Sequence, residues 1–354
     1  MENLEIKNFY KNKRVLITGH NGFKGTWLTL WLEKLGAKIY GISLPEKGEK
    51  KKFFNNVVSS KVKSDLFNIC DYKKLKKKIN FFKPEICFHL AAQPLVIDSY
   101  KDPIKTIDTN VVGLNNVLEI LRSSSSIKSI VIITSDKCYK ENNIGIYDEK
   151  SQLGGEDPYS ASKAMQEILS ESYKKSYFEK KGVGLATVRA GNIIGGCDFA
   201  KYRLVPDIFK SIYFKKTLTV RNPHYIRPWQ FIGDVTYFYM LLAKKLHQNS
   251  DKYSTNFNVS PDLNKLSKKF TVKKILDISK KNFPKLKYII SKKKKFKESK
   301  KLLLKNNKLK KYFKFKNKFN LKNSLIYTFL TYELFYKDGK KLKNFIYNEI
   351  FKKY

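Results

Sequence analysis

The chain has 354 residues, and its 72 lysine and arginine residues against 31 aspartate and glutamate residues give a formal net charge of +41. This length is large for one hydrophobic core and suits two lobes. Nearly all of the cations are lysine, whereas a groove that reads nucleic acid is expected to be enriched in arginine. We therefore expect no nucleic-acid partner, in spite of the net charge.

Cysteine and histidine are scattered. Neither the four cysteines nor the four histidines show the short spacings of a metal site, so we expect no metal. The first ten residues are charged, unlike a signal peptide. No run approaches the roughly 20 apolar residues that a membrane helix needs. We therefore expect a soluble, cytoplasmic protein that does not bind a membrane.

Strands alternate with helices through the first half of the chain. The pattern of apolar residues predicts strands at 15–18, 38–43, 62–66, 85–90, 129–135 and 185–190, and helices at 26–35, 71–81, 103–122 and 159–179. This alternation predicts an α/β fold, a doubly wound parallel Rossmann-type sheet with right-handed crossovers. Ligands bind at the carboxyl ends of the strands in such sheets. Motifs that follow different strands should therefore meet at one edge.

The composition of the sequence and the pattern of its predicted elements change after Gly195. Proline becomes frequent, and helical patterns are predicted at 268–281 and 321–335. The lysine-rich tract 292–319 keeps recurring apolar residues, so we expect it to be folded. We predict a Rossmann domain at residues 1–195 and a smaller C-terminal lobe at residues 196–354, partly interleaved with the first.

A glycine-rich loop, residues 19–25, follows the first predicted strand. Its sequence Gly-His-Asn-Gly-Phe-Lys-Gly lies between a strand and an amphipathic helix, which is the context of a dinucleotide-binding fingerprint. Glycine allows a tight turn and close approach of a pyrophosphate to the helix N-terminus. The end of the second strand, residues 40–44, lacks the acidic residue that grips an adenosine ribose. The residues alone therefore leave NAD and NADP open.

A second motif places Tyr159 and Lys163 one turn apart on the same face of a helix. A free phenol has a pKa of about 10, and a nearby cation favours the phenolate, which makes it a usable base. Such a pair suits the oxidation of an alcohol, with a hydride leaving for a nicotinamide. Upstream, Ser135, Asp136 and Lys137 offer a hydrogen-bond donor, a candidate acid and a candidate second base. The combination indicates an oxidoreductase-type fold that performs an elimination.

Together these motifs resemble the extended short-chain dehydrogenase/reductase enzymes, the NAD-dependent epimerase/dehydratase family, and within them the branch of 4,6-dehydratases that act on CDP-glucose. The resemblance covers nearly the whole chain and is most specific at residues 19–25, 135–139 and 227–230. It implies NAD as cofactor, with NADP not excluded, a sugar-nucleotide substrate, a homodimer or homotetramer, and a role in deoxysugar biosynthesis for surface polysaccharide. The alternative is a dehydratase or epimerase acting on a dTDP-, GDP- or UDP-hexose.

The resemblance also implies roles for individual residues. The implied catalytic residues are Ser135, Asp136, Lys137, Tyr159 and Lys163. The implied cofactor-binding residues are Gly19, Asn21, Gly22, Phe23, Lys24, Gly25, Asp65, Leu66, Leu90, Ala91 and Ala92, together with Tyr159 and Lys163. The implied substrate-binding residues are Gln93, Asn192, Arg203, Arg227 and Trp229. A nicotinamide-dependent fold retained only as a basic nucleic-acid-binding or scaffold protein would show an eroded site, whereas all five catalytic positions are filled.

In the mechanism that the resemblance implies, Tyr159 takes the proton of the C4 hydroxyl and Asp136 protonates the departing C6 hydroxyl. Lys137 stands where relatives acting on dTDP-glucose carry the glutamate that removes the C5 proton. A lysine with its ordinary pKa of about 10.4 is protonated and is no base. Lys137 is therefore either a base whose pKa is lowered by its surroundings or a cation that stabilises the enolate. The sequence does not choose between the two.

Overall fold

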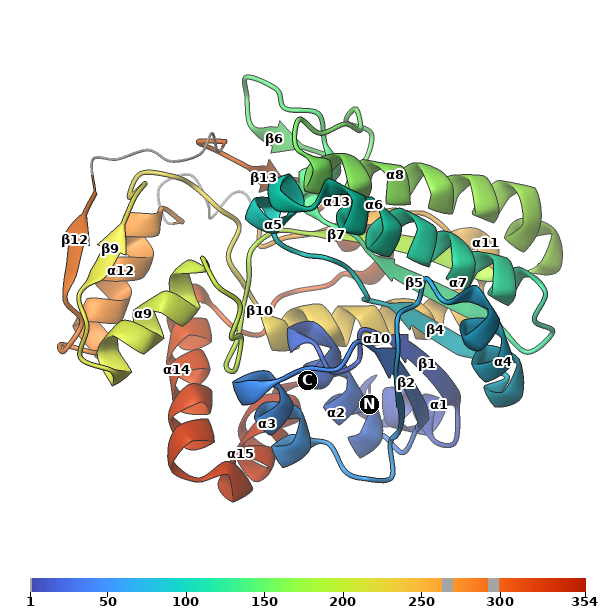
Figure 1. Cartoon of the computed structure of the whole chain (residues 1–354), viewed down its shortest axis with the longest axis horizontal. Coiled ribbons are helices and arrows are strands. Elements are labelled where there is room, and N and C mark those ends of the chain that lie inside the picture. Colours follow the sequence, from blue (N-terminus) through green and yellow to red (C-terminus); the bar gives the residue numbers. More distant parts are fainter. Residues whose placement is uncertain (1, 263–269, 292–298) are drawn as a thin grey trace.

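A parallel sheet of seven strands forms the centre of the molecule. The computed structural model describes residues 2–262, 270–291 and 299–354, with the backbone alone for residues 2–4 (Figure 1). The strands lie in the spatial order β11-β7-β5-β4-β1-β2-β3. Their bounds are Arg14–Thr18 (β1), Lys38–Ser43 (β2), Lys63–Leu66 (β3), Ile86–His89 (β4), Ser129–Ile133 (β5), Gly184–Ala190 (β7) and Asn256–Val259 (β11).

This strand order confirms the predicted α/β class with a doubly wound parallel sheet. From β1 the chain builds outward through β2 and β3, and then builds outward on the other side through β4, β5, β7 and β11. The order reverses between β1 and β4, which pair directly. A reversal of this kind opens a crevice beyond the carboxyl ends of the strands. The topology thus fixes where a ligand can enter the sheet edge.

All six predicted strands are present, each within two residues of its predicted ends. The sequence analysis did not predict β11, because its four residues alternate between asparagine and apolar side chains in a stretch with few other strand signals. The remaining strands are short and form two-stranded pairs outside the main sheet. They are Ile146–Tyr147 (β6), Ile193–Ile194 (β8), Leu218–Val220 (β9), Gln230–Phe231 (β10), Tyr288–Ile290 (β12) and Leu303–Leu304 (β13).

Helices cover both faces of the sheet (Figure 1). Within the described ranges they are Glu2–Tyr10 (α1), Phe23–Lys34 (α2), Gly48–Val57 (α3), Tyr72–Phe82 (α4), Val96–Lys101 (α5), Pro103–Ile107 (α6), Gly113–Arg122 (α7), Pro158–Tyr173 (α8), Leu204–Tyr213 (α9), Ile232–Gln248 (α10), Ser250–Tyr253 (α11), Val272–Asn282 (α12), Asn307–Phe313 (α13), Leu321–Lys337 (α14) and Gly339–Phe345 (α15). None of these helices is both long enough and apolar enough to cross a membrane.

Two hydrophobic cores, one on each face, hold the sheet between the helices. Val15 and Val131 face one core, which they share with α1, α2 and α10. Leu16 and Ile130 face the other, which they share with α4 and α7. Successive side chains of a strand point to opposite faces, so the inner strands β1, β4, β5 and β7 contribute to both cores. This explains why every residue of β7 is buried, whereas the edge strand β3 is polar and mostly exposed.

The predicted helix at 103–122 is wound less regularly than its apolar pattern indicates. It consists of α6, a π-helical turn at Asp108–Val112, and α7. Within that turn Asn110 is fully buried. Its Nδ2 donates to Ser162 Oγ at 2.8 Å, and its Oδ1 accepts from the backbone N–H of Gln93 at 2.8 Å. The π-helical turn therefore joins α8 to the segment that follows β4. The predicted helix at 159–179 likewise continues beyond α8 as a π-helical turn, Lys174–Phe178, and a 3₁₀ turn, Glu179–Lys181.

The C-terminal half is divided between the sheet and a separate group of elements. Helix α10 and strand β11 lie beyond residue 195 and yet belong to the sheet and its core. Elements α9, β9, α12, β12 and α14 gather at the left of Figure 1. The helix predicted at 268–281 corresponds to α12, except that residues 268 and 269 lie outside the described ranges. Within the lysine-rich tract, residues 292–298 lie outside those ranges, and the rest contains β13 and α13.

The turn between β1 and α2 depends on glycine at two places. Gly19 has a φ of +77°, and a Cβ on Gly25 would lie 1.9 Å from the carbonyl oxygen of Gly19. We expect Gly25→Ala to lower the free energy of unfolding by about 1–3 kcal/mol or more, because both sides of the contact are backbone. A Cβ on Gly22 would meet its nearest atom at 3.5 Å, so Gly22→Ala should cost no more than about 1 kcal/mol. Urea unfolding without cofactor compares the two, and equal losses would contradict this account.

Candidate active site

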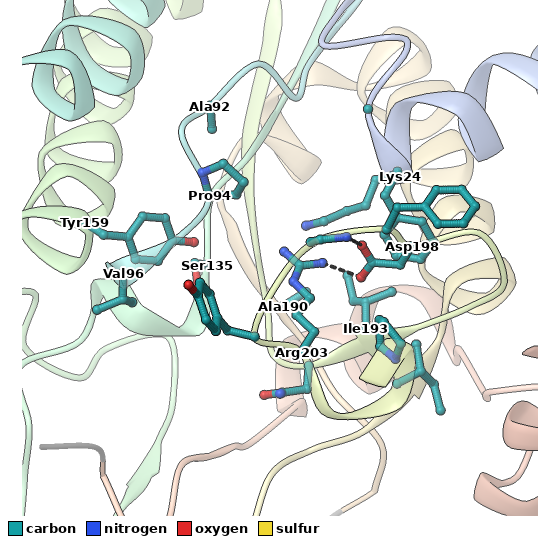
Figure 2. A pocket seen from close by; sticks show the side chains of 18 of the residues that line it. Lys24, Ala92, Pro94, Val96, Ser135, Tyr159, Ala190, Ile193, Asp198 and Arg203 are labelled. Atoms are coloured by element: carbon teal, nitrogen blue, oxygen red, sulfur yellow. Dashed lines mark hydrogen bonds and ion pairs between the residues drawn. The ribbon is translucent and has the colours of Figure 1, made fainter. Parts of the chain in front are cut away.

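A cavity of about 690 Å³ lies beyond the carboxyl ends of the strands and is lined by segments that follow β1, β2, β3, β4, β5 and β7 (Figure 2). The predicted site residues that line it are Gly19, Asn21, Gly22, Phe23, Lys24, Gly25, Leu90, Ala91, Ala92, Ser135, Asp136, Lys137, Tyr159, Lys163, Asn192, Arg203, Arg227 and Trp229. The structure thus brings together side chains that are up to 210 residues apart in the sequence, Gly19 to Trp229.

Three predicted residues do not line the cavity. Asp65 accepts from the Tyr40 hydroxyl and pairs with Lys78 Nζ at 2.6 Å. Leu66 is 52 % exposed. The amide of Gln93 is occupied locally, since its Nε2 donates to the Leu95 carbonyl at 3.0 Å and to Thr106 Oγ1 at 2.9 Å.

Several lining residues were missed by the sequence analysis. Beyond β3 they are Phe67, Asn68 and Ile69, and beyond β2 they are Ser43, Leu44, Glu46 and Lys50. The signal was available, because each group comes directly after a predicted strand end, where parallel sheets bind ligands.

The glycine loop brings the N-terminus of α2 to the cavity wall. Gly22 caps α2 without a side-chain hydrogen bond. A Cβ on Gly19 would lie 2.7 Å from the backbone nitrogen of Ala91, so the loop packs directly on the segment after β4. Asn21 Nδ2 donates to the Leu44 carbonyl at 2.9 Å and fastens the loop to the end of β2. The result is a backbone cradle with free helix N–H groups, which suits a diphosphate.

Ser135, Asp136 and Lys137 form a tight turn immediately after β5. Ser135 Oγ donates to Asp136 Oδ1 at 3.0 Å and accepts from the backbone N–H of Lys137 at 3.2 Å. Burial raises the pKa of Asp136 above its ordinary value, and the nearby Lys137 opposes this shift. A carboxyl group that keeps its proton to a higher pH can serve as a proton donor. Lys137 is half-buried in the cavity wall.

Tyr159 and Lys163 project from the first turns of α8, whose N-terminus is capped by Asp157. Figure 2 shows the hydroxyl of Tyr159 directed towards Ser135. Burial raises the pKa of Tyr159 to about 12, and a hydrogen bond with Ser135 works in the opposite direction. Burial, and then the charge of Lys24, lower the pKa of Lys163 to about 7. The sequence motif predicts that Lys163 makes the phenol more acidic, whereas the cost of burying a phenolate is the largest influence on the pKa of Tyr159.

A buried network behind the cavity holds the catalytic loop, residues 134–139. Glu167, one turn after Lys163 on α8, accepts from Arg189 Nη2 at 2.7 Å and from Thr134 Oγ1. Arg189 Nη1 donates to the Tyr139 hydroxyl at 2.9 Å. The ion pair is almost completely buried, with side-chain exposures of 3 % and 2 %. The network grips the catalytic loop at both ends, and the sequence analysis did not identify it.

Four of the five predicted substrate-binding residues line the cavity, and their side chains differ in the hydrogen bonds that they make. Arg203 Nη1 pairs with Asp198 Oδ2 at 2.7 Å. Arg227 Nη2 donates to the Ser299 carbonyl at 2.7 Å, which connects it to the C-terminal lobe. Trp229 is 6 % exposed, and in the described part of the chain its Nε1 has no hydrogen-bond partner. The side chain of Asn192 lines the cavity, while its carbonyl accepts from the backbone of Gln230.

No metal centre is evident in the described ranges, because nowhere in them do three or more histidine, cysteine, aspartate or glutamate side chains gather as ligands.

The network predicts a large difference between two glutamates on α8. Glu167→Gln leaves the buried Arg189 without a countercharge, so we expect a loss of about 3–5 kcal/mol in the free energy of unfolding. Glu171, one turn further, is 46 % exposed and pairs with Lys174 and with the exposed Lys175, so Glu171→Gln should cost less than about 1 kcal/mol. Urea unfolding measures both. Similar losses in the two variants would show that the ion pair does not hold the loop.

Comparison with known proteins supports the same site. The family model described as GDP-mannose 4,6 dehydratase matches residues 16–326. The chain is 44 % identical over 261 residues to CDP-glucose 4,6-dehydratase of Salmonella typhimurium, covering 72 % of this chain and 73 % of that protein. It is 29 % identical to dTDP-D-glucose 4,6-dehydratase of Dictyostelium discoideum, over 70 % of this chain and 59 % of that protein.

Solved structures share the fold at lower identity. UDP-glucose 4-epimerase of Thermotoga maritima superimposes with a TM-score of 0.77 at 20 % identity, covering 90 % of this chain and 98 % of that chain. UDP-glucose 4-epimerase of Thermus thermophilus gives 0.76 at 19 % identity, over 92 % and 99 %. The resemblance to the NAD-dependent epimerase/dehydratase enzymes is confirmed. The protein is an enzyme of the nucleotide-sugar dehydratases and belongs to the GDP-mannose 4,6-dehydratase family.

Proposed function

We propose that this protein is an NAD-dependent CDP-glucose 4,6-dehydratase, a hydro-lyase that converts CDP-glucose into CDP-4-keto-6-deoxyglucose and water. One observation carries the proposal: Tyr159, Lys163 and the buried acid Asp136 converge on one cavity beside the glycine loop. The first two suit alcohol oxidation, and the third suits the loss of a hydroxyl. The 44 % identity to the Salmonella typhimurium enzyme supports CDP-glucose as the substrate.

The residues present fit a dinucleotide. At Gly19 and Gly25 the backbone lies so close to neighbouring backbone atoms that an added Cβ would collide with them. The turn leaves the N-terminus of α2 open to a diphosphate. No arginine follows β2 before the end of α3, and arginine is the residue that commonly holds the extra phosphate of NADP. The fold neighbour from Thermus thermophilus is a complex with NAD. When bound, NAD supplies the temporary acceptor for one hydride.

The side chains of this protein then act on the sugar in turn. Tyr159 accepts the proton of the C4 hydroxyl, while Ser135 holds the C4 oxygen and Lys163 supports the phenolate. The new ketone makes the C5 proton acidic. Asp136 donates its proton to the C6 hydroxyl, which leaves as water once the C5 proton is removed. Lys137, from the same turn as Asp136, acts at C5, either as the base or as a cation beside the enolate.

The proposal extends to the roles of the two parts of the chain and to the assembly of the protein. We assign cofactor binding to residues 1–195 and sugar-nucleotide binding mainly to residues 196–354, from which Arg203, Arg227 and Trp229 reach the cavity. We further propose a cytoplasmic homodimer or homotetramer that supplies a deoxysugar for surface polysaccharide. These points rest on the family resemblance, and light scattering of the purified protein tests the assembly.

Lys137 should be needed for the elimination and not for the oxidation. We expect Lys137→Ala to keep its affinity for NAD and to lower turnover by at least about a hundredfold, with loss of solvent deuterium exchange at C5. Mass spectrometry of substrate recovered from D₂O gives the readout. Lys140→Ala is the matched control, because Lys140 lies exposed three residues further. Normal exchange and turnover in Lys137→Ala would remove this lysine from the mechanism.

The decisive experiment follows the hydride. CDP-glucose carrying deuterium at C4 should yield a 4-keto-6-deoxy product with that deuterium in its C6 methyl group. A mixture of labelled and unlabelled substrate should show no exchange between molecules, because the cofactor stays bound through each turnover. Deuterium in free reduced cofactor would mean an ordinary dehydrogenase, and deuterium retained at an inverted C4 would mean an epimerase. Parallel assays with dTDP-, GDP- and UDP-glucose test the choice of nucleotide.

A further inference from the structure

Lys24 is the side chain of the glycine loop that reaches furthest into the cavity. It belongs to the first turn of α2, where the backbone N–H groups face the dinucleotide cradle. Figure 2 shows its side chain leaving that cradle and extending across the cavity towards Arg203 and Asp198, which come from the C-terminal half of the chain. The backbone and the side chain of Lys24 therefore point at different regions of the site.

The ammonium group of Lys24 belongs to a half-buried residue of the cavity wall. Burial lowers its pKa to about 8, and the charge of Arg203 adds to this effect. No hydrogen bond or ion pair satisfies it within the ranges that the structure describes, whereas Lys50, another lysine of the same cavity, pairs with Glu46 at 3.3 Å. A partly buried cation that lacks a countercharge is costly. A residue kept in this state indicates a ligand that supplies the missing negative charge.

The surroundings of Lys24 show which kind of ligand fits. Figure 2 shows Lys24, Arg203 and Asp198 on one side of the cavity, and the Asp198 carboxylate already pairs with Arg203 Nη1 at 2.7 Å. Asp198 thus neutralises Arg203, and Lys24 is a second cation beside this pair. On the other side, the electrostatic influence of Asp136 places Lys24 near the acid that we assign to the C6 hydroxyl. A phosphate linked to the reacting sugar would lie between these groups and would relieve the repulsion of the cations.

We propose that the side chain of Lys24, together with Arg203, binds the sugar-linked phosphate of the nucleotide-sugar substrate, while its backbone serves the cofactor. The inference rests on the proposed function for the position of the sugar and extends it to a residue that determines diphosphate binding. Asp198 acts as a positioning residue, because it holds the guanidinium of Arg203 towards the cavity.

Binding to inactive protein tests the role of Lys24. In a Tyr159→Phe background, calorimetry with CDP-glucose, CDP and CMP compares Lys24→Met with the matched control Lys50→Met. Methionine keeps the length and the helix propensity of lysine, so the fold should persist. We expect Lys24→Met to weaken binding of CDP-glucose and CDP by about tenfold to a hundredfold, the worth of a hydrogen bond to a charged group. The loss for CMP should be smaller, and NAD affinity should change less than twofold.

The outcomes separate this inference from the proposed function. Unchanged affinity for CDP in Lys24→Met, or a loss confined to NAD, would overturn the role of Lys24, whatever the wild-type enzyme converts. An equal loss in Lys50→Met would also overturn it, because general charge would then explain the effect. If wild type converts a different nucleoside diphosphate sugar, the matching diphosphate replaces CDP. If wild type binds no nucleoside diphosphate, both the inference and the proposed function are wrong.

Discussion

The ion pair between Arg189 and Glu167 is the interaction on which the arrangement of the catalytic groups depends. It joins β7 to α8, and through Thr134 and Tyr139 it also holds both ends of the catalytic loop. Desolvation of two charges roughly cancels their attraction in such a buried pair, so its main effect need not be net stability. Its geometric effect is direct, since Lys163 lies on the same face of α8, one turn from Glu167. The proposed base, Tyr159, and the proposed acid, Asp136, are thereby held in a fixed relative position.

Burial then decides the protonation of the site. It raises the pKa of Asp136 and lowers those of Lys163, to about 7, and Lys24, to about 8. Each of these shifts favours the neutral form, as low dielectric surroundings require. An anionic ligand would favour the charged lysines again. The many lysines of the surface take no part in this, because solvent screens them.

The fold alone does not decide between the reactions of its relatives. Epimerases share the fold, and a fold of this kind hosts many activities. The distinction lies in a few side chains of the catalytic loop. A site that only oxidises and reduces a sugar carbon needs a base such as Tyr159 and a hydride acceptor. The buried acid Asp136, in the turn after β5, adds the means to expel a hydroxyl group. The assignment to the dehydratases and the geometry of the turn therefore agree.

Local sequence was sufficient for six of the seven strands of the sheet and for their ends. A parallel strand buried on both faces is a continuous apolar run in the sequence. Such a run can be recognised without knowing which strands pair with it. The glycine loop and the Tyr159–Lys163 spacing are equally local, which is why they could be read directly. The position of the cavity follows as well, because carboxyl ends of parallel strands meet at one edge.

Tertiary structure decided what depends on distant partners. Arg189 and Glu167 became an ion pair only when β7 packed on α8, and β11 joined the sheet only through pairing with β7. The side-chain amide of Gln93 donates hydrogen bonds to Leu95 and Thr106, and Gln93 does not line the cavity. Burial is the largest influence on the pKa of Tyr159, and spacing along a helix does not reveal burial. Pairing and desolvation are sums over neighbours from many parts of the chain, whereas a sequence motif records only the residues beside it.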